Sequence, residues 1–142
     1  IYLVRGLKVV APTDERQRER LEKAGRILSR CRARQAAGDA VGLSAITVAE
    51  LEYGARHSGD YAKEISAVRK ILAPFATYDF DATACAAHYG EVRQTLETAG
   101  LNIGAMDLLI ASHAKALAAT LVTNNTGHFS RVAGLRYENW TV

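Results

Sequence analysis

Apolar residues recur every three to four positions in several stretches of the chain, which is the pattern of amphipathic helices. In the two clearest stretches the apolar positions fall at i, i+4, i+7 and i+11. Pro74 follows the first and Gly100 follows the second, and both residue types commonly end helices. The predicted helices are Asp14–Gln35, Ser44–Ala55, Tyr61–Leu72, Cys85–Leu96 and Asp107–Leu117.

Four short segments between or after these helices predict strands, the first of them wholly apolar apart from Gly42 and Ser44. Because strands alternate with helices, they indicate βαβ units, which place the strands in a parallel sheet with helices on both faces. The predicted fold class is therefore α/β, a three-layer α/β/α domain with a central parallel sheet. Residues Asn124–Phe129 are predicted as a loop at one end of that sheet. The predicted strands are Val41–Ala45, Thr77–Phe80, Thr120–Thr123 and Leu135–Trp140.

The length of 142 residues is that of one domain, so we expect residues 1–142 to form a single unit. The two cysteines, Cys31 and Cys85, form no CxxC pair and cannot make a disulfide framework. No apolar run approaches the roughly 20 residues that a helix needs to cross a bilayer. These features predict a cytoplasmic protein without membrane contact.

The net charge of +3 conceals an uneven distribution. Ten basic and four acidic residues lie between Arg5 and Arg34, so that stretch carries +6 and the rest of the chain −3. A basic segment beside an acidic body suits a polyanionic partner. The alternative is a solvated helix face on which Arg and Glu side chains pair at i, i+4. The candidate residues for binding such a polyanion are Arg26, Arg30 and Arg34.

Polar residues at three points of the chain lie where an open parallel sheet binds ligands, outside the carboxyl ends of its strands. Glu50 lies in the first turns of the helix after one strand, Asp107 opens another helix, and Asn125 follows a third strand. Carboxylate, amide and hydroxyl oxygens without His or Cys are ligands for a hard cation such as Mg²⁺ or Mn²⁺. Asn124 and Thr126 flank Asn125 after the strand that ends at Thr123.

Each of these residues also has a structural interpretation. The helix macrodipole favours an acid such as Glu50 in a first turn, and Asn124-Asn125 is a common turn sequence. A carboxylate at Asp107, among Met, Leu and Ile, is costly unless it is partnered. Replacing it with Asn should then leave folding intact or improve it. His128 is interpreted as a surface-loop residue, with contact to a substrate phosphate as the alternative.

Four segments resemble, in order, the motifs of PIN-domain ribonuclease toxins of the VapC type. Ser44–Gly54 is similar to the second motif, Gly104–Ala114 to the third acidic motif, and Leu121–Phe129 to the fourth. Val132–Trp140 resembles the usual ending of the family. Each motif is weak alone, whereas the set in this order and spacing is specific.

The resemblance implies a small metal-dependent endoribonuclease whose acidic cluster binds Mg²⁺ or Mn²⁺. It implies that Glu50 and Asp107 are metal-binding carboxylates and that Asn125 supports the metal from a position where many relatives have Asp. The residues implied to support these ligands are Thr123, Asn124 and Thr126. The resemblance also implies a toxin held inactive by a VapB-like antitoxin, a homodimer, an RNA substrate, and contact with DNA only through the antitoxin.

Two features depart from the family pattern. Relatives begin with a strand reading roughly Leu-Asp-Thr-Asn, whose Asp is the central metal ligand, whereas this chain begins at Ile1 with a short predicted helix that Pro12 closes. Because a sheet without its central strand would leave backbone groups unpaired in the core, we expect the natural protein to extend upstream of Ile1. In addition, the extended basic segment 9–40 is longer than the family pattern and would widen an RNA surface or form part of an antitoxin groove.

Two other functions stay open at this point. A catalytically inactive PIN-like module that binds RNA or a protein is favoured by the missing first Asp and by Asn125. A flavodoxin-like receiver or phosphatase would use an Asp at a strand end, such as Asp79, but lacks the Thr or Ser and Lys arrangement expected after it.

Overall fold

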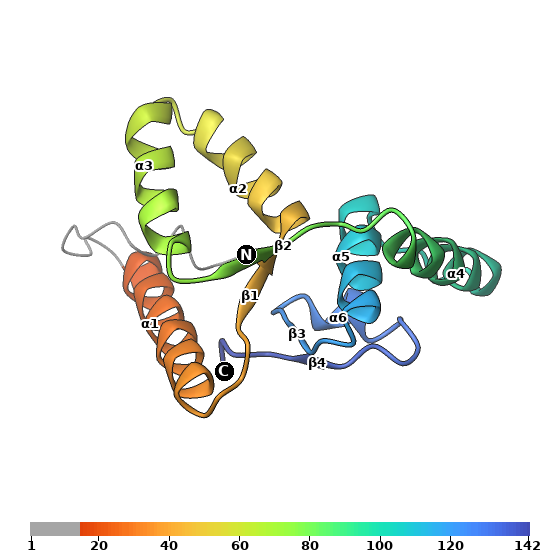
Figure 1. The fold of residues 1–142 in the computed structure, drawn as a ribbon. Helices are drawn as coiled ribbons and strands as arrows, with labels where there is room; N and C mark the ends of the chain where they lie inside the picture. Colours follow the sequence, from red (N-terminus) through yellow and green to blue (C-terminus); the bar gives the residue numbers. More distant parts are fainter. Residues whose placement is uncertain (1–14) are drawn as a thin grey trace. The chain divides into compact units, whose positions relative to one another are not determined.

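The computed structural model describes residues 15–142, which form two compact units (Figure 1). The first unit contains residues 15–43, 47–77 and 140–142, and the second contains Ser44–Ile46 and Tyr78–Asn139. The short helix predicted before Pro12 lies outside the described residues. Within residues 15–142, no helix combines the length and the apolar character needed to cross a membrane.

The basic segment folds into helix α1 (Glu15–Ala36), which confirms the helix predicted over Asp14–Gln35. Its apolar side consists of Ala24, Ile27 and Cys31, all of which are buried. Burial raises the pKa of the Cys31 thiol, because the charged thiolate would be shielded from water. The thiol therefore acts as a small core side chain.

Helices α2 (Ala45–Arg56) and α3 (Tyr61–Leu72) follow one another along the chain and confirm two further predicted helices (Figure 1). Their apolar sides share a small core of buried residues in the first unit. The buried members of that core are Ala55, Ile65 and Val68, and the partly buried ones are Leu51, Tyr61 and Leu72.

Side-chain caps fix where both helices begin. The Ser44 hydroxyl accepts a hydrogen bond from the backbone N–H of Ile46 at 3.1 Å. The Asp60 carboxylate accepts one from the backbone N–H of Lys63 at 3.2 Å. Because the first N–H groups of a helix have no partner inside it, such caps stabilise the helix by about 1 kcal/mol each. The cap at Ser44 confirms the helix start predicted there.

Helices α4 (Ala84–Ala99) and α5 (Ala105–Ala116) pack side by side and supply most of the core of the second unit (Figure 1). Gly100 ends α4 in the left-handed conformation with φ of 67°, which confirms its predicted role. The buried core residues are Val92, Leu96, Ile103, Leu108, Ile110, Ala111, Ala114, Phe129, Val132 and Leu135.

The four strands are short and pair in twos. Strand β1 (Gly42–Ser44) pairs with β2 (Ala76–Tyr78), and β3 (Leu121–Val122) pairs in parallel with β4 (Tyr137–Glu138). The predicted alternation of strands and helices is therefore present, and the pair β3–β4 has the predicted parallel direction. Within residues 15–142, however, the strands form two two-stranded sheets and not one continuous sheet.

The strands are shorter than predicted because a strand extends only as far as its hydrogen-bonded partner. In the second sheet the N–H of Leu121 donates to the carbonyl of Arg136, and the N–H of Thr123 donates to that of Glu138, both at 2.9 Å. Beyond Thr123 the backbone turns into a short helix, α6 (Thr126–Phe129). The ladder therefore ends at the point where the polar residues of the fourth motif begin.

The loop predicted over Asn124–Phe129 is wrong in its second half, where α6 forms one helical turn. The physical reason is the burial of Phe129, which is 2% exposed and belongs to the core of the second unit. The backbone N–H of Ser130 donates to the carbonyl of Thr126 at 2.9 Å and closes the turn. A single apolar residue in a polar segment has no periodicity, so the sequence pattern could not reveal this turn.

Candidate functional site

Asp107 is the third residue of α5 and lies in its first turn. A carboxylate is stabilised there by the positive end of the helix macrodipole. Its side chain is 21% exposed, so it is sheltered from water without being enclosed by the apolar residues beside it in sequence. Met106, the preceding residue, is itself 39% exposed. The expected conflict between this acid and its apolar neighbours is therefore avoided by the orientation of the helix.

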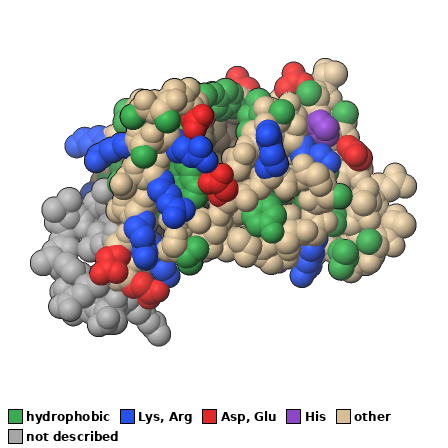
Figure 2. Space-filling model, turned by 90° about the horizontal axis from the view of Figure 1, so that it is seen from below, with side chains coloured by type: hydrophobic (Ala, Val, Ile, Leu, Met, Phe, Trp, Pro, Cys, Tyr) green, Lys and Arg blue, Asp and Glu red, His purple; other side chains and the backbone are tan. Residues whose placement is uncertain are grey.

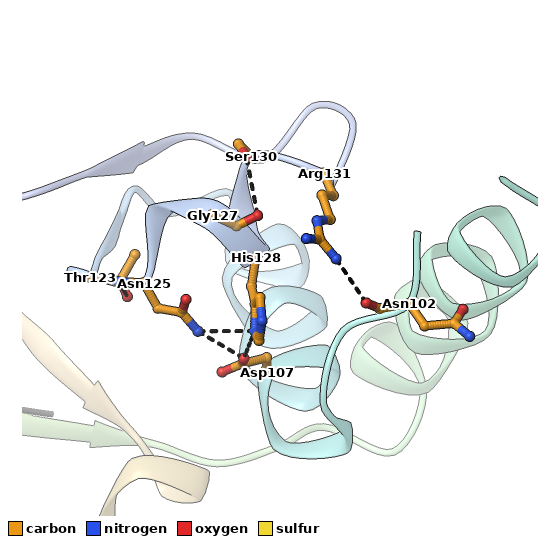
Figure 3. Close-up of polar contacts among 8 residues, drawn as sticks. All are labelled: Asn102, Asp107, Thr123, Asn125, Gly127, His128, Ser130 and Arg131. Carbon is orange, nitrogen blue, oxygen red and sulfur yellow. Dashed lines mark hydrogen bonds and ion pairs between the residues drawn. The ribbon is translucent and has the colours of Figure 1, made fainter. Parts of the chain in front are cut away.

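Two side chains from the segment after β3 converge on one oxygen of Asp107 (Figure 3). The Nδ2 of Asn125 donates to Oδ2 of Asp107 at 3.0 Å. The Nδ1 of His128 lies 2.6 Å from the same Oδ2. The two nitrogens lie 3.1 Å from each other. Asp107, Asn125 and His128 thus form one polar cluster, which we call the Asp107 cluster.

The backbone around Asn125 is held in place from both sides. The backbone N–H of Asn125 donates to the Thr123 hydroxyl at 3.1 Å. Asn125 occupies the cap position of α6, but its side chain makes no capping bond there and reaches Asp107 instead. On the other side, the guanidinium of Arg131 donates to the carbonyl of Asn102 at 3.0 Å (Figure 3). The segment is therefore anchored to the connection between α4 and α5.

The remaining site residues predicted from the sequence take different positions. Asn124 is exposed beside the cluster, and Thr126 is the half-buried first residue of α6. Glu50 is half-buried on α2 and belongs to the first unit, whereas Asp107 belongs to the second. The structure therefore brings Asp107 and Asn125 together, with Thr123 supporting Asn125. The pairing of Glu50 with Asp107 stays a prediction.

The cluster offers oxygen donors of the kind that hard divalent cations prefer. The hydrogen bonds described above use Oδ2 of Asp107 and Nδ2 of Asn125, and they leave the Oδ1 atom of each residue as a ligand atom. Carboxylate and amide oxygens suit Mg²⁺ or Mn²⁺. Within residues 15–142, no three His, Cys, Asp or Glu side chains are grouped so that they would hold a metal ion. The match between the Asp107 cluster and a divalent cation therefore rests on the chemistry of its oxygen donors.

His128 is the residue of this cluster that sequence reasoning missed, because it was interpreted as part of a surface loop. Its ring is 42% exposed, yet its Nδ1 contacts the carboxylate of Asp107. The available signal was its spacing. His128 lies three positions after Asn125, so one turn of helix places both side chains on the same side.

A second polar contact in this unit involves His113, which is 1% exposed on α5. Its Nδ1 lies 2.8 Å from the Ser44 hydroxyl, and the ring meets Phe80 edge-on with centroids 5.6 Å apart. Its Nε2 is buried without a hydrogen-bond partner among the described residues. Burial lowers the pKa of His113, while the backbone and carboxylate of Asp79 act in the opposite direction. The ring is therefore a neutral core group at neutral pH.

The candidate RNA-binding arginines on α1 also contact the first unit itself. The guanidinium of Arg30 donates to the backbone carbonyl of Val142 at 3.2 Å, and that of Arg34 pairs with Asp39 at 3.1 Å. Lys23 pairs with Glu19 at 2.6 Å, one turn away, as the solvated-face alternative predicts. Figure 2 shows Lys and Arg side chains interspersed with Asp and Glu on the face that it presents.

Known proteins with similar sequences and structures are ribonucleases and toxin–antitoxin complexes. The family model of the PIN domain matches residues 9–135. Ribonuclease VapC2 of Rickettsia felis is 45% identical over 105 residues, which cover 74% of this chain and 78% of that protein. The tRNA(fMet)-specific endonuclease VapC of Shigella flexneri is 37% identical over 99 residues, covering 70% and 74%. The crystal structure of VapBC2 from Rickettsia felis, bound to a promoter DNA fragment, matches with a TM-score of 0.71 and 45% identity over 74% of this chain and 78% of that one.

The chain therefore belongs to the PIN-domain family. Within that family it belongs to the VapC ribonuclease toxins, which are the toxin components of VapBC toxin–antitoxin systems. The resemblance found in the sequence motifs is confirmed, and so is the α/β fold class. The family membership gives the Asp107 cluster its chemical context, because this cluster joins the third and fourth motifs of the resemblance.

Proposed function

We propose that this chain cleaves RNA phosphodiester bonds with the help of a Mg²⁺ or Mn²⁺ ion held by Asp107 and Glu50. Asn125 would support the ion through its amide oxygen or through a bridging water. When bound, a divalent ion neutralises charge on the phosphate that is cut and activates the nucleophile. The other named residues, Thr123, Asn124 and Thr126, would support the positions of these ligands.

The observation that carries the proposal is the arrangement around Asp107. The carboxylate lies in the first turn of α5, its Oδ2 accepts the bond from Asn125, and its Oδ1 is left as a ligand atom. A carboxylate held in one orientation binds a cation better than a mobile one, because less side-chain freedom is lost on binding. A partly exposed acid held in this way suits a ligand-binding role, since exposure leaves room for the substrate.

Cleavage of RNA by the full chain tests this proposal. We expect the chain to cut RNA with added Mn²⁺ or Mg²⁺, to stop on addition of EDTA, and to recover when Mn²⁺ is returned in excess. Asp107→Asn and Glu50→Gln should each abolish cleavage, since both variants replace a carboxylate with a neutral amide. His88→Ala, on α4, serves as the control and should cut at the normal rate. Cleavage that resists EDTA, or full activity of Asp107→Asn, contradicts the proposal.

The substrate class follows from the relatives. One of them is named a tRNA(fMet)-specific endonuclease, so we propose that a structured RNA such as a tRNA is cut in a single-stranded loop. Unpaired bases are accessible to a protein, whereas those inside an RNA helix are hidden in a deep, narrow groove. Total RNA separated on a gel, followed by sequencing of the new ends, would identify the cut positions.

We propose that the α1 arginines contribute to RNA binding, with Arg26, Arg30 and Arg34 on the same helix. Joint reversal of Arg26 and Arg30 to Glu should weaken binding and flatten its dependence on salt. The logarithmic slope should fall by about 0.7 for each phosphate of single-stranded RNA that the variant no longer neutralises. Reversal of Arg93 on α4, which pairs with Glu97, is the control for each single reversal, Arg26→Glu or Arg30→Glu, because it changes the net charge by the same amount. Equal effects of both reversals would support the solvated-face alternative instead.

We also propose that the chain is neutralised by an antitoxin, forms a homodimer and contacts DNA only through the antitoxin. Support comes from the similar solved structures, which are toxin–antitoxin complexes, one of them bound to promoter DNA. The place of action would be the cytoplasm, where buried free thiols such as Cys31 and Cys85 stay reduced. Co-expression with the neighbouring reading frame and light scattering of the purified chain, alone and in the complex, would test these assignments.

A second function, a PIN-like module that binds RNA without cutting it, is favoured by one observation. The described residues contain no group of three acidic, His or Cys side chains around Asp107. The cleavage assay separates the two functions, because a binding module would bind RNA in the presence of Mn²⁺ and leave it intact.

A further inference from the structure

His128 contacts the acid that the proposed function places at the metal. Its Nδ1 lies 2.6 Å from Oδ2 of Asp107, which is a short hydrogen bond of the kind that a charged carboxylate accepts. Asn125 reaches the same oxygen at 3.0 Å. Figure 3 shows both side chains pointing from the segment around α6 toward the carboxylate on α5. One carboxylate oxygen thus receives two nitrogen atoms, which come from positions three residues apart.

The chemistry of the carboxylate, the imidazole and the amide determines which group donates each hydrogen bond. A carboxylate oxygen offers only lone pairs, so Nδ1 of His128 carries the hydrogen and donates it to Asp107. The amide Nδ2 of Asn125 donates in the same way. Since Nδ1 then has no free lone pair, the 3.1 Å approach of the two nitrogens reflects their shared acceptor and not a bond between them.

We propose that His128 is a positioning residue for Asp107. Together with Asn125, it holds Oδ2 on the side of α6 and thereby leaves Oδ1 as the oxygen offered to a divalent cation. The inference rests on the proposed function, because it assumes that Asp107 is a cation ligand. The inference also explains the amide at Asn125. The amide donates a hydrogen bond to Asp107, whereas a carboxylate at this position would repel it.

The backbone that carries His128 is itself anchored, which a positioning role requires. Phe129, the next residue, is 2% exposed in the core of the second unit. The Thr123 hydroxyl accepts the backbone N–H of Asn125 at 3.1 Å. The imidazole therefore projects from a fixed turn, and its orientation is transmitted to the carboxylate. Hydrogen-bond partners behind a metal ligand typically contribute 10- to 100-fold to metal affinity.

The test is a calorimetric titration of the full chain with Mn²⁺ in the absence of RNA. We expect His128→Ala to weaken Mn²⁺ binding by roughly 10- to 100-fold. His128→Asn should retain most of the affinity, because its amide nitrogen can occupy the place of Nδ1. His88→Ala is the matched control: His88 is also a partly exposed histidine beside an acid, 3.4 Å from Glu91, and its removal should change nothing.

A double-variant cycle adds a readout that a general loss of structure would not give. In the Asp107→Ala background, removal of His128 should have no further effect on Mn²⁺ binding, since the side chain that it positions is gone. Equal Mn²⁺ affinity of the unaltered chain and His128→Ala overturns the inference while leaving the proposed function intact. Failure of the unaltered chain to bind Mn²⁺ overturns both, and loss of binding in His128→Asn as severe as in His128→Ala overturns the hydrogen-bonding role.

Discussion

Asp107→Asn removes one charge from the centre of the Asp107 cluster and changes little else in size. In the structure Oδ2 accepts from Asn125 at 3.0 Å and contacts Nδ1 of His128 at 2.6 Å. The amide oxygen of the variant can occupy the place of Oδ2 and still accept, but as a neutral group. The variant therefore tests the contribution of the negative charge separately from the shape of the side chain.

The magnitude follows from the two hydrogen bonds and the helix position. Hydrogen bonds to a charged group contribute about 1.5–3 kcal/mol and neutral ones about 0.5–1.5 kcal/mol, so each bond should weaken by roughly 1 kcal/mol. The His128 ring is 42% exposed, which reduces its share through solvent screening. Loss of the favourable interaction with the α5 macrodipole adds about 0.3–1 kcal/mol. We expect a total loss of about 1.5–3 kcal/mol in the free energy of unfolding.

This expectation differs from the one based on the sequence alone, which is that replacing an acid among apolar neighbours with Asn leaves folding intact or improves it. The structure gives the carboxylate two partners, so its charge stabilises the fold. Urea denaturation at neutral pH measures the difference directly, and thermal unfolding should show a lower midpoint, by roughly 2–4 °C for each kcal/mol in a chain of this length. RNA cleavage, measured on the same samples, should be abolished.

The result that refutes this reasoning is an Asp107→Asn variant more stable than the unaltered chain. It would mean that the carboxylate is poorly satisfied and that its hydrogen bonds do not balance the cost of burial. An unstable variant with full ribonuclease activity would refute the proposed role of Asp107 in cleavage, because the acid would then stabilise the fold alone. A stable fold with no activity and unchanged unfolding free energy would show that the two hydrogen bonds contribute nothing measurable.

Three further predictions rest on single residues of the fold. Because burial lowers the pKa of His113, the unfolded chain binds a proton at a higher pH than the folded one. Stability should therefore fall as the pH drops below about 6.5. The urea midpoint of His113→Asn should fall less over the same pH interval. Phe129→Ala should cost about 3–5 kcal/mol of stability and also weaken Mn²⁺ binding, since α6 loses its anchor; unchanged Mn²⁺ affinity in the folded variant would show that the turn forms without it. Gly100→Ala should cost about 1–2 kcal/mol, because its φ of 67° is unfavourable for a residue with a Cβ, and a neutral effect in thermal unfolding would contradict the left-handed cap.

Local features of the chain could be predicted because they depend on neighbours in sequence. The helical spacing over Tyr61–Leu72 gives the bounds of α3 as the structure has them, and Gly100 ends α4 as its lack of a side chain allows. The single turn of α6 was missed, since its one apolar residue, Phe129, forms no pattern by itself. The strands were placed correctly in order but were too long, because strand length depends on the partner strand.

The sequence by itself indicated candidate residues for the chemistry and the elements on which they lie. Motif order and spacing indicated Asp107, Asn125 and Glu50 as candidates, and the helix pattern placed Asp107 in a first turn. Only the tertiary structure decided which side chains meet. Asp107 and His128 are 21 residues apart, and Ser44 and His113 are 69 apart. Periodicity records the geometry of one helix or strand, whereas contacts between distant segments depend on how their apolar faces pack against one another.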